Sequence, residues 1–223
     1  MVYYSGMSKW IITGASGSVA TACINILLAN QFTIDAYSRN KLNVYDKNIT
    51  FNKVTDYKNI AFDMENCECL LIAQGYFKYH LVENMQIEDL QSTIEANFTS
   101  QIDVLHAFLK QVKKDRRINI VILGSTSSYE AGSGTVIYGA AKAGILGLVK
   151  ALNKEYVDTD IRFWLISFGT LANKMGSKVP NQELDTLLDV NMVAQEIFDK
   201  VNNTSNLWQP EIVIRRRHIR TTN

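Results

Sequence analysis

A tyrosine and a lysine four residues apart are the side chains of this sequence best suited to proton transfer. Tyr138 and Lys142 belong to Tyr-Gly-Ala-Ala-Lys, which opens a stretch of small residues with helical spacing. Residues i and i+4 share one face of a helix, so an ammonium beside the phenol makes the phenol proton easier to lose. Ser125 lies thirteen residues upstream, just after an apolar run. This set predicts reversible redox chemistry between an alcohol and a carbonyl.

The elements that must position these residues alternate along the chain. Short apolar runs predict strands, and the segments between them predict helices. The expected strands are 10–13, 32–37, 49–54, 70–73, 118–123, 161–167 and 211–214. The expected helices follow the first strand up to residue 30 and then cover 90–112, 136–156 and 182–201. This α/β alternation indicates a parallel sheet with helices on both faces, although the connection over 54–70 is too short for a full crossover helix.

Length and composition predict one domain over residues 1–223, with residues 1–7 as a flexible extension. The 23 basic and 22 acidic side chains nearly cancel, which argues against a mainly electrostatic nucleic-acid binder. Three cysteines form no paired metal signature, so we expect no metal site. The sequence has no signal peptide and no apolar run near the ~20 residues of a membrane helix, so we expect a cytoplasmic protein without a membrane contact.

A glycine-containing turn follows the first expected strand. It reads Thr-Gly-Ala-Ser-Gly-Ser-Val-Ala and places three small residues at G-x-x-G-x-x-A spacing, namely Gly14, Gly17 and Ala20. Glycine allows a tight turn and lets backbone N–H groups approach a pyrophosphate at the helix N-terminus. Ser16 and Ser18 can add hydroxyl donors. A Gly-Ser turn can also simply join a strand to a helix, but its place at the first strand–helix junction favours nucleotide binding.

The end of the second expected strand distinguishes between two nicotinamide cofactors. A carboxylate there hydrogen-bonds the ribose hydroxyls of NAD, whereas an arginine accommodates the extra phosphate of NADP. Here neutral Ser38 is followed by Arg39, which favours NADP. Asp35, 21 residues beyond Gly14, keeps NAD as the alternative. Arg39 can also be an ordinary solvated charge at a strand end.

The glycine turn, Asn97, Ser125 and the Tyr-Gly-Ala-Ala-Lys segment together resemble the short-chain dehydrogenase/reductase family over nearly the whole chain. The resemblance implies a three-layer, doubly wound Rossmann-type fold and a nicotinamide cofactor. Tyr138 would be the general acid/base, and Lys142 would lower its pKa and hold the nicotinamide ribose. Ser125 would orient the substrate oxygen, and Asn97 would support a proton-relay water.

The same resemblance implies a set of cofactor contacts at the ends of the strands. Besides Tyr138 and Lys142, they are Gly14, Ser16, Gly17, Ser18, Val19, Ser38, Arg39, Ala73, Gln74, Gly75, Phe168, Gly169, Thr170 and Leu171. The sequence departs from the family at three places. Asn-Asn-Ala-Gly is replaced by Ile-Ala-Gln-Gly over 72–75, Pro-Gly is replaced by Phe-Gly over 168–169, and the aspartate facing the adenine is replaced by Asn52 or Lys53.

Each catalytic candidate also has a structural interpretation. Tyr138 can pack on the sheet, Lys142 can be a solvated charge, Ser125 can be a turn residue, and Asn97 can cap or kink its helix. Three functions therefore stay open. They are an NADP-dependent oxidoreductase, a nucleotide-sugar epimerase or dehydratase of the same family, and a non-catalytic cofactor-binding sensor.

The expected pocket wall covers 76–80, 127–130 and 171–188 and is aromatic and polar. It favours a small polar carbonyl or alcohol as substrate, and Lys78 or His80 can either meet an anion or belong to a solvated loop. The resemblance also suggests a homodimer or homotetramer. The basic segment 215–220 can bind phosphate or nucleic acid, or form an exposed end or a subunit contact, of which the last two are favoured.

Overall fold

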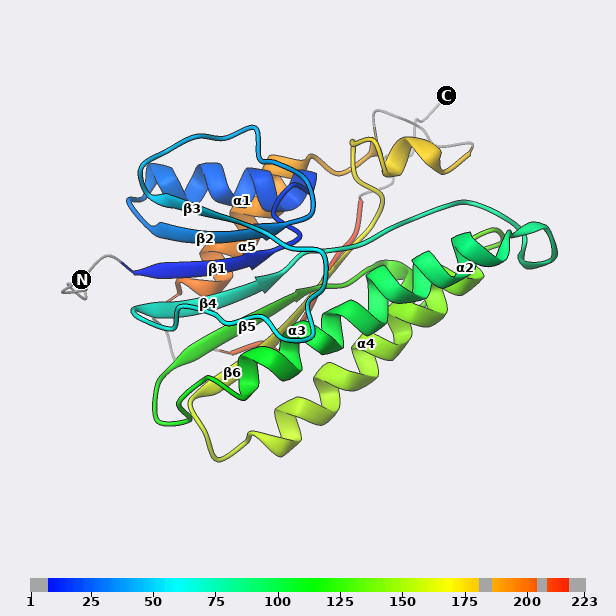
Figure 1. Ribbon diagram of the computed structural model, residues 1–223. Helices are drawn as coiled ribbons and strands as arrows, with labels where there is room; N and C mark the ends of the chain where they lie inside the picture. The colour runs from blue at the N-terminus through cyan, green and yellow to red at the C-terminus, as the bar shows by residue number, and fades with distance from the viewer. Residues whose placement is uncertain (1–7, 181–185, 204–207, 217–223) are drawn as a thin grey trace, which may run out of the picture.

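Seven parallel strands form one sheet at the centre of the molecule (Figure 1). The computed structural model describes residues 8–180, 186–203 and 208–216. The strand order is β3-β2-β1-β4-β5-β6-β7, so the chain moves outward from β1 in one direction and then in the other. The strands are β1 (Lys9–Thr13), β2 (Thr33–Ser38), β3 (Ile49–Lys53), β4 (Cys67–Ile72), β5 (Ile118–Leu123), β6 (Ile161–Phe168) and β7 (Glu211–Ile214).

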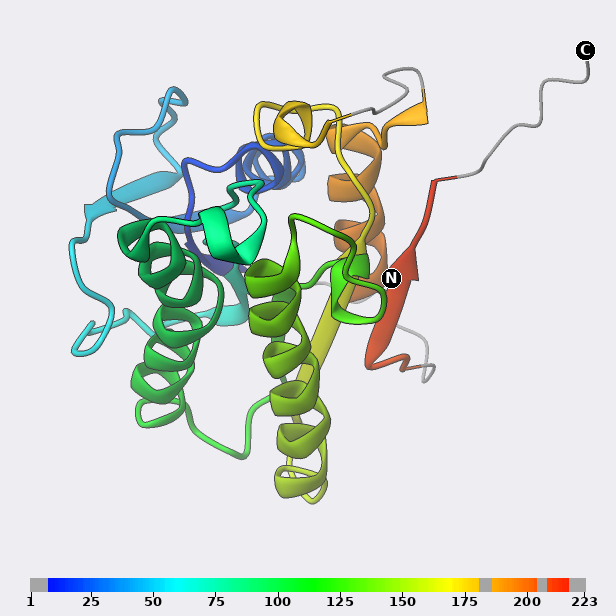
Figure 2. The same ribbon diagram turned by 90° about the vertical axis from the view of Figure 1, so that its right-hand side faces the viewer.

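Helices cover both faces of this sheet and complete a single three-layer domain. On one face lie α1 (Ser18–Ala29) and α5 (Val190–Val201), which pack against each other. On the other face lie α2 (Ile87–Ile94), a π-helical turn (Glu95–Thr99), α3 (Ser100–Leu109) and α4 (Val136–Glu155). Figure 2 shows α4 beside the α2–α3 helix, with α5 on the opposite side of the sheet. Short 3-10 turns cover Val82–Asn84, Thr126–Ser128 and Gly176–Lys178.

The first strand shows how the sheet separates two hydrophobic cores. Side chains alternate across a strand, so Trp10 and Ile12 enter the core under α1 and α5, whereas Ile11 enters the core under α3 and α4. Every residue of β5 is buried, as expected for a central strand covered on both faces. Burial of β4 also keeps its two cysteines in the thiol form, because it raises the pKa of Cys67 to about 12 and that of Cys69 well above its ordinary value.

The seven predicted strands are confirmed, and so is the shortened connection between β3 and β4, which contains no helix. The helix predicted over 90–112 is found as the continuous run from Ile87 to Leu109, interrupted by the π turn. The helix predicted over 182–201 is wrong in its first part. Residues 187–189 are not helical, and α5 begins at Val190, because the Asp189 carboxylate caps it by accepting the N–H groups of Asn191 and Met192.

The predicted extension over 1–7, residues 182–185 and the last part of the basic segment 215–220 lie outside the described residues. Within the described part of the chain, α4 alone has the length and apolarity of a membrane-crossing helix. Ile145, Val149 and Leu152 of this helix are buried in the core. The apolar composition of α4 is thus that of a helix packed on a sheet.

Candidate active site

A cavity of about 850 Å³ lies at the carboxyl ends of the strands. Residues directly after β1, β2, β4 and β5 border it, and so does the last residue of β6. Ligands of open parallel sheets bind at this edge, where the strand order reverses, and here the order reverses between β1 and β4. Most of the predicted cofactor residues border the cavity, namely Gly14, Ser16, Gly17, Ser18, Val19, Ser38, Arg39, Ala73, Gln74, Gly75, Lys142, Phe168 and Leu171.

The glycine turn at this edge is built for close backbone approach. Gly14 has φ +67, and a Cβ added to it would lie 2.4 Å from the backbone nitrogen of Gln74. Only glycine fits both restrictions. Gly17 is the N-cap of α1, and no side chain caps the first turn of that helix. The N–H groups at the start of α1 therefore suit a phosphate anion, and the turn fits a dinucleotide.

The Ser38 hydroxyl lies next to this turn. Its Oγ donates a hydrogen bond of 2.7 Å to Ser16 Oγ and accepts one of 3.3 Å from the Asn40 backbone. Ser38 is buried, while Arg39 and Asn40 are exposed at the cavity border. The second strand thus brings a hydroxyl and a cation to the place where a nucleotide ribose would lie.

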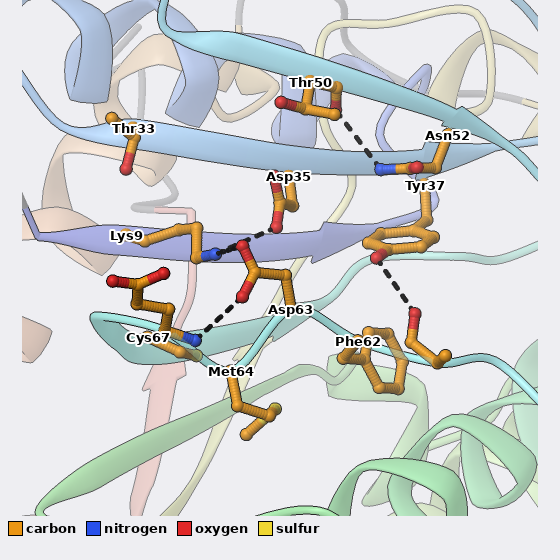
Figure 3. Close-up of polar contacts among 12 residues, drawn as sticks. Lys9, Thr33, Asp35, Tyr37, Thr50, Asn52, Phe62, Asp63, Met64 and Cys67 are labelled. Atoms are coloured by element: carbon orange, nitrogen blue, oxygen red, sulfur yellow. Dashed lines mark hydrogen bonds and ion pairs between the residues drawn. The ribbon is translucent and has the colours of Figure 1, made fainter.

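Asp35 does not reach this place, so its predicted role as the carboxylate that reads the ribose of NAD is wrong. It lies in the middle of β2, and Lys9 Nζ of the neighbouring strand is 3.3 Å from its Oδ2 (Figure 3). Lys9 also pairs with Asp63, at 2.5 Å. Both Lys9 and Asp35 are buried and satisfied by each other, which makes this carboxylate a structural group of the sheet.

Several residues that the sequence motifs did not indicate also border the cavity, and four of them are consecutive. Thr55, Asp56, Tyr57 and Lys58 all come from the connection after β3. Asn52 and Lys53, the residues matched to the family's aspartate facing the adenine, lie within β3 and outside the cavity border. Parallel strands end at the same edge of a sheet, and β3 pairs with β2. The pairing of β3 with β2 would have predicted residues 55–58 at the cavity, because they follow β3 directly.

Gln74 stands at the alanine position of the family's Asn-Asn-Ala-Gly motif and joins three elements. Its Oε1 accepts a hydrogen bond of 2.7 Å from Thr13 Oγ1, and its Nε2 donates one of 3.3 Å to the Ser100 carbonyl. Gln101 Nε2 in turn donates to the Gln74 carbonyl at 2.9 Å. The Gln74 side chain and carbonyl therefore tie the ends of β1 and β4 to α3 at the cavity border.

Tyr138 and Lys142 lie on α4 as predicted, at the other end of the cavity. The Tyr138 ring packs edge-on against Phe77, with centroids 5.1 Å apart. Lys142 is 4% exposed, borders the cavity, and has its Nζ 6.0 Å from the centre of the Tyr138 ring. That Nζ donates a hydrogen bond of 2.8 Å to the Leu123 carbonyl at the end of β5.

Burial shifts the pKa values of both Tyr138 and Lys142. It raises the pKa of Tyr138 above its ordinary value, and a hydrogen bond with Ser125 acts in the opposite direction. It lowers the pKa of Lys142 to about 8. Burial of the phenol is the larger of these two effects on the pKa of Tyr138, and a lowering of that pKa by Lys142 stays a prediction.

Ser125 is a turn residue, as considered from the sequence, and the orientation of a substrate oxygen by its hydroxyl stays a prediction. It is buried beside β5, and its Oγ accepts a hydrogen bond of 3.1 Å from the Ser127 backbone, which caps the 3-10 turn Thr126–Ser128. It also shares the hydrogen bond with Tyr138. The turn thus holds the serine hydroxyl against the phenol.

Asn97 lies in the π-helical turn and is fully buried. Its Nδ2 donates hydrogen bonds of 2.6 Å to the Tyr76 carbonyl and 2.9 Å to the Thr93 carbonyl, whereas its Oδ1 has no partner among the described residues. Asn97 does not border the cavity. Its visible action is to hold the segment after β4, and π turns of this kind are frequent at functional sites.

The remaining predicted residues divide between the border and its surroundings. Ser125, Tyr138, Gly169 and Thr170 are not among the residues that border the cavity, whereas Tyr76, Asn173 and Met175 are. Asn173 Nδ2 donates a hydrogen bond of 2.8 Å to Ser18 Oγ and so ties the loop after β6 to the glycine turn. Of the predicted anion contacts, Lys78 is paired with Asp89 at 2.5 Å.

Comparisons with known proteins agree with this geometry. A family model described as short chain dehydrogenase matches residues 9–184. Carbonyl reductase family member 4 of Xenopus laevis is 26% identical over 59% of this chain and 56% of its own length, so the match spans little more than half of that relative. 3-Oxoacyl-(acyl-carrier-protein) reductase FabG of Rickettsia typhi is 22% identical over 84% of this chain and 82% of its own.

The fold is also found among solved structures. A short chain dehydrogenase from Burkholderia cenocepacia, solved in complex with NADP, is 16% identical and has a TM-score of 0.81. The likeness covers 93% of this chain and 88% of that protein. At this identity the likeness concerns the fold.

Proposed function

Because this chain belongs to the short-chain dehydrogenase family, we propose that it is an NADP(H)-dependent oxidoreductase that interconverts a carbonyl and an alcohol. Tyr138 is the general acid/base of this reaction. The observation that carries the proposal is that Tyr138 lies near both Ser125 and Lys142, and that Lys142 borders the cavity. A phenol near a hydroxyl and a buried amine is suited to exchanging a proton with a substrate oxygen.

A nicotinamide cofactor, when bound, supplies or accepts the hydride. The residues of the chain transfer the proton and orient the substrate and the ribose. In reduction the Tyr138 hydroxyl gives its proton to the substrate oxygen, which Ser125 orients through a second hydrogen bond; in oxidation the proton returns. Lys142 has three N–H donors, of which Leu123 takes one, so it can also hold a ribose hydroxyl.

The choice of NADP rests on Arg39 at the cavity border and on the pairing of Asp35 with Lys9. The NADP complex of the similar Burkholderia cenocepacia protein supports it. The substrate is a small polar carbonyl or alcohol, because Tyr76, Asn173 and Gln74 give this part of the border a polar character. Both relatives are named as reductases, which agrees with this class of reaction.

The test is a comparison of the wild type with Tyr138→Phe. The wild type binds NADPH, seen as a change in nicotinamide fluorescence, and oxidises it with a member of a panel of polar carbonyl compounds. Tyr138→Phe lowers kcat about 10²- to 10⁴-fold and leaves NADPH affinity within about twofold. Tyr129→Phe is the control, since its hydroxyl pairs with Glu211, and keeps its activity.

Full activity of Tyr138→Phe would contradict the mechanism. Isomerisation or dehydration of a nucleotide sugar without net cofactor turnover would instead indicate an epimerase or dehydratase. NADPH binding with no turnover across either panel would indicate a cofactor-binding sensor.

A further inference from the structure

The cavity border at the nucleotide end contains two cations from different strands. Arg39 directly follows β2, and Lys58 belongs to the connection after β3. Both side chains are exposed, and among the described residues neither forms an ion pair. The NADP preference proposed above rests on Arg39, so the second cation is unassigned.

Strand pairing explains why the two segments meet. Ser38, the last residue of β2, is in register with Lys53, the last residue of β3, and the Val54 backbone donates a hydrogen bond of 3.1 Å to the Ser38 carbonyl. The chain therefore leaves both strands side by side. Because no helix fills the connection to β4, residues 55–58 continue along the cavity border.

Two contacts hold this connection in position. Burial raises the pKa of Tyr57, while a hydrogen bond with the Gly14 backbone and the charge of Arg39 act in the opposite direction, so the Tyr57 hydroxyl lies near both groups. The Asp56 carboxylate accepts the backbone N–H of Lys58 at 3.0 Å. Asp56 is the one carboxylate on this segment of the border, which leaves the nucleotide end with an excess of one positive charge over Arg39, Asp56 and Lys58.

We propose that Lys58 is a second specificity-determining residue, which together with Arg39 binds the 2′-phosphate of NADP(H). An arginine and a lysine on two sides of a phosphate dianion give charge-assisted hydrogen bonds that the ribose hydroxyl of NAD cannot make. The inference rests on the proposed function and assigns its cofactor selectivity to the β3–β4 connection. It follows that this connection, which contains no helix, contributes to the choice of cofactor.

The experiment measures binding of adenosine 2′,5′-bisphosphate and of 5′-AMP by isothermal titration, because these ligands differ only in the 2′-phosphate. The wild type binds the bisphosphate more tightly. Lys58→Ala weakens the bisphosphate about tenfold and 5′-AMP less than about twofold, and Lys58→Arg restores most of the loss. NADPH and NADH, followed by fluorescence, show the same pattern.

Lys53→Ala is the matched control, since this exposed lysine ends β3 but does not border the cavity, and it changes neither ligand. The melting temperature of each variant confirms that it is folded. Equal losses for both ligands, no loss for either, or the same effect from Lys53→Ala would overturn the role of Lys58. A wild type that binds neither NADPH nor NADH would overturn the proposed function itself.

Discussion

The two ends of the cavity are constructed differently. At the end near Gly14, the nucleotide end, the main chain forms the site. Gly14 lies close to the backbone of Gln74, and α1 starts without a side-chain cap. At the end near Tyr138, side chains form the site, and each of three polar side chains there is hydrogen-bonded to a backbone group. Lys142 donates to the Leu123 carbonyl, Ser125 accepts from the Ser127 N–H, and Asn97 donates to the Tyr76 carbonyl.

This difference predicts which substitutions each end of the cavity tolerates. A main-chain site fails when an atom is added, because packed backbone cannot move aside. A side-chain site fails when a polar atom is removed or its charge altered, because its geometry depends on hydrogen bonds and burial. Substitutions at the two ends should therefore separate cofactor binding from turnover.

The largest effect is expected from Gly14→Ala at the nucleotide end. The added Cβ meets backbone atoms of Gln74 at 2.4 Å, and the residue must keep φ +67. We expect NADPH affinity to fall at least about 100-fold and the free energy of unfolding to fall by about 1–3 kcal/mol. Titration and urea denaturation measure the two quantities.

Gly147→Ala is the control for this change. It lies within α4, where an added Cβ meets nothing within 4 Å, so it should raise the free energy of unfolding by about 0.5–1 kcal/mol and leave NADPH binding intact. Normal NADPH affinity in Gly14→Ala would show that the turn does not approach the cofactor.

The buried lysine gives the second effect, which depends on pH. Its pKa is about 8 in the folded protein and 10.5 ordinarily, so between these values the unfolded chain binds more protons. The free energy of unfolding should therefore rise with pH across this window, by up to about 3 kcal/mol. Lys142→Met removes this contribution and flattens the rise.

Denaturation of both proteins at several pH values from 7 to 10.5 measures the difference in slope. Other groups titrate in the same range, but they are common to the two proteins. Parallel curves would mean that burial does not perturb Lys142. Under the proposed function, Lys142→Met should also lower kcat, because the lysine proposed to hold the nicotinamide ribose is removed.

Asn97→Asp is expected to have the smallest effect of the three. The carboxylate has the same shape but cannot donate to the Tyr76 and Thr93 carbonyls, so the segment after β4 loosens. We expect kcat to fall about tenfold while NADPH affinity changes less than about threefold. Steady-state kinetics and fluorescence titration measure these values.

Thr99→Ser, a conservative change in the same π turn, should keep both values. If Asn97→Asp weakened NADPH binding as strongly as Gly14→Ala, the division between the two ends of the cavity would be incorrect.

Local patterns explain why much of the fold was predictable. Strands buried on both faces read as apolar runs, so β4, β5 and β6 were visible in the sequence. The helix that contains Tyr138 was visible from its spacing. The start of α5 was not, because its amphipathic pattern extends beyond the point where Asp189 caps the first turn.

The candidate site was predictable where chemistry depends on local spacing. Gly14 and Gly17 follow a strand, and Tyr138 and Lys142 are one helical turn apart, so the sequence alone brings each pair together. Contacts between distant segments were not predictable in this way. The pairing of Asp35 with Lys9 depends on the register of β1 against β2, which no local pattern reveals.

The sequence by itself thus determined the alternating fold, the glycine turn and the Tyr-Lys pair, because helix periodicity and the freedom of glycine are local properties. Tertiary structure alone decided that Asp35 forms an ion pair with Lys9, that Lys58 and Arg39 both border the cavity, and that burial raises the pKa of Tyr138. The physical reason is that ion pairing, strand register and desolvation depend on which segments the fold brings together.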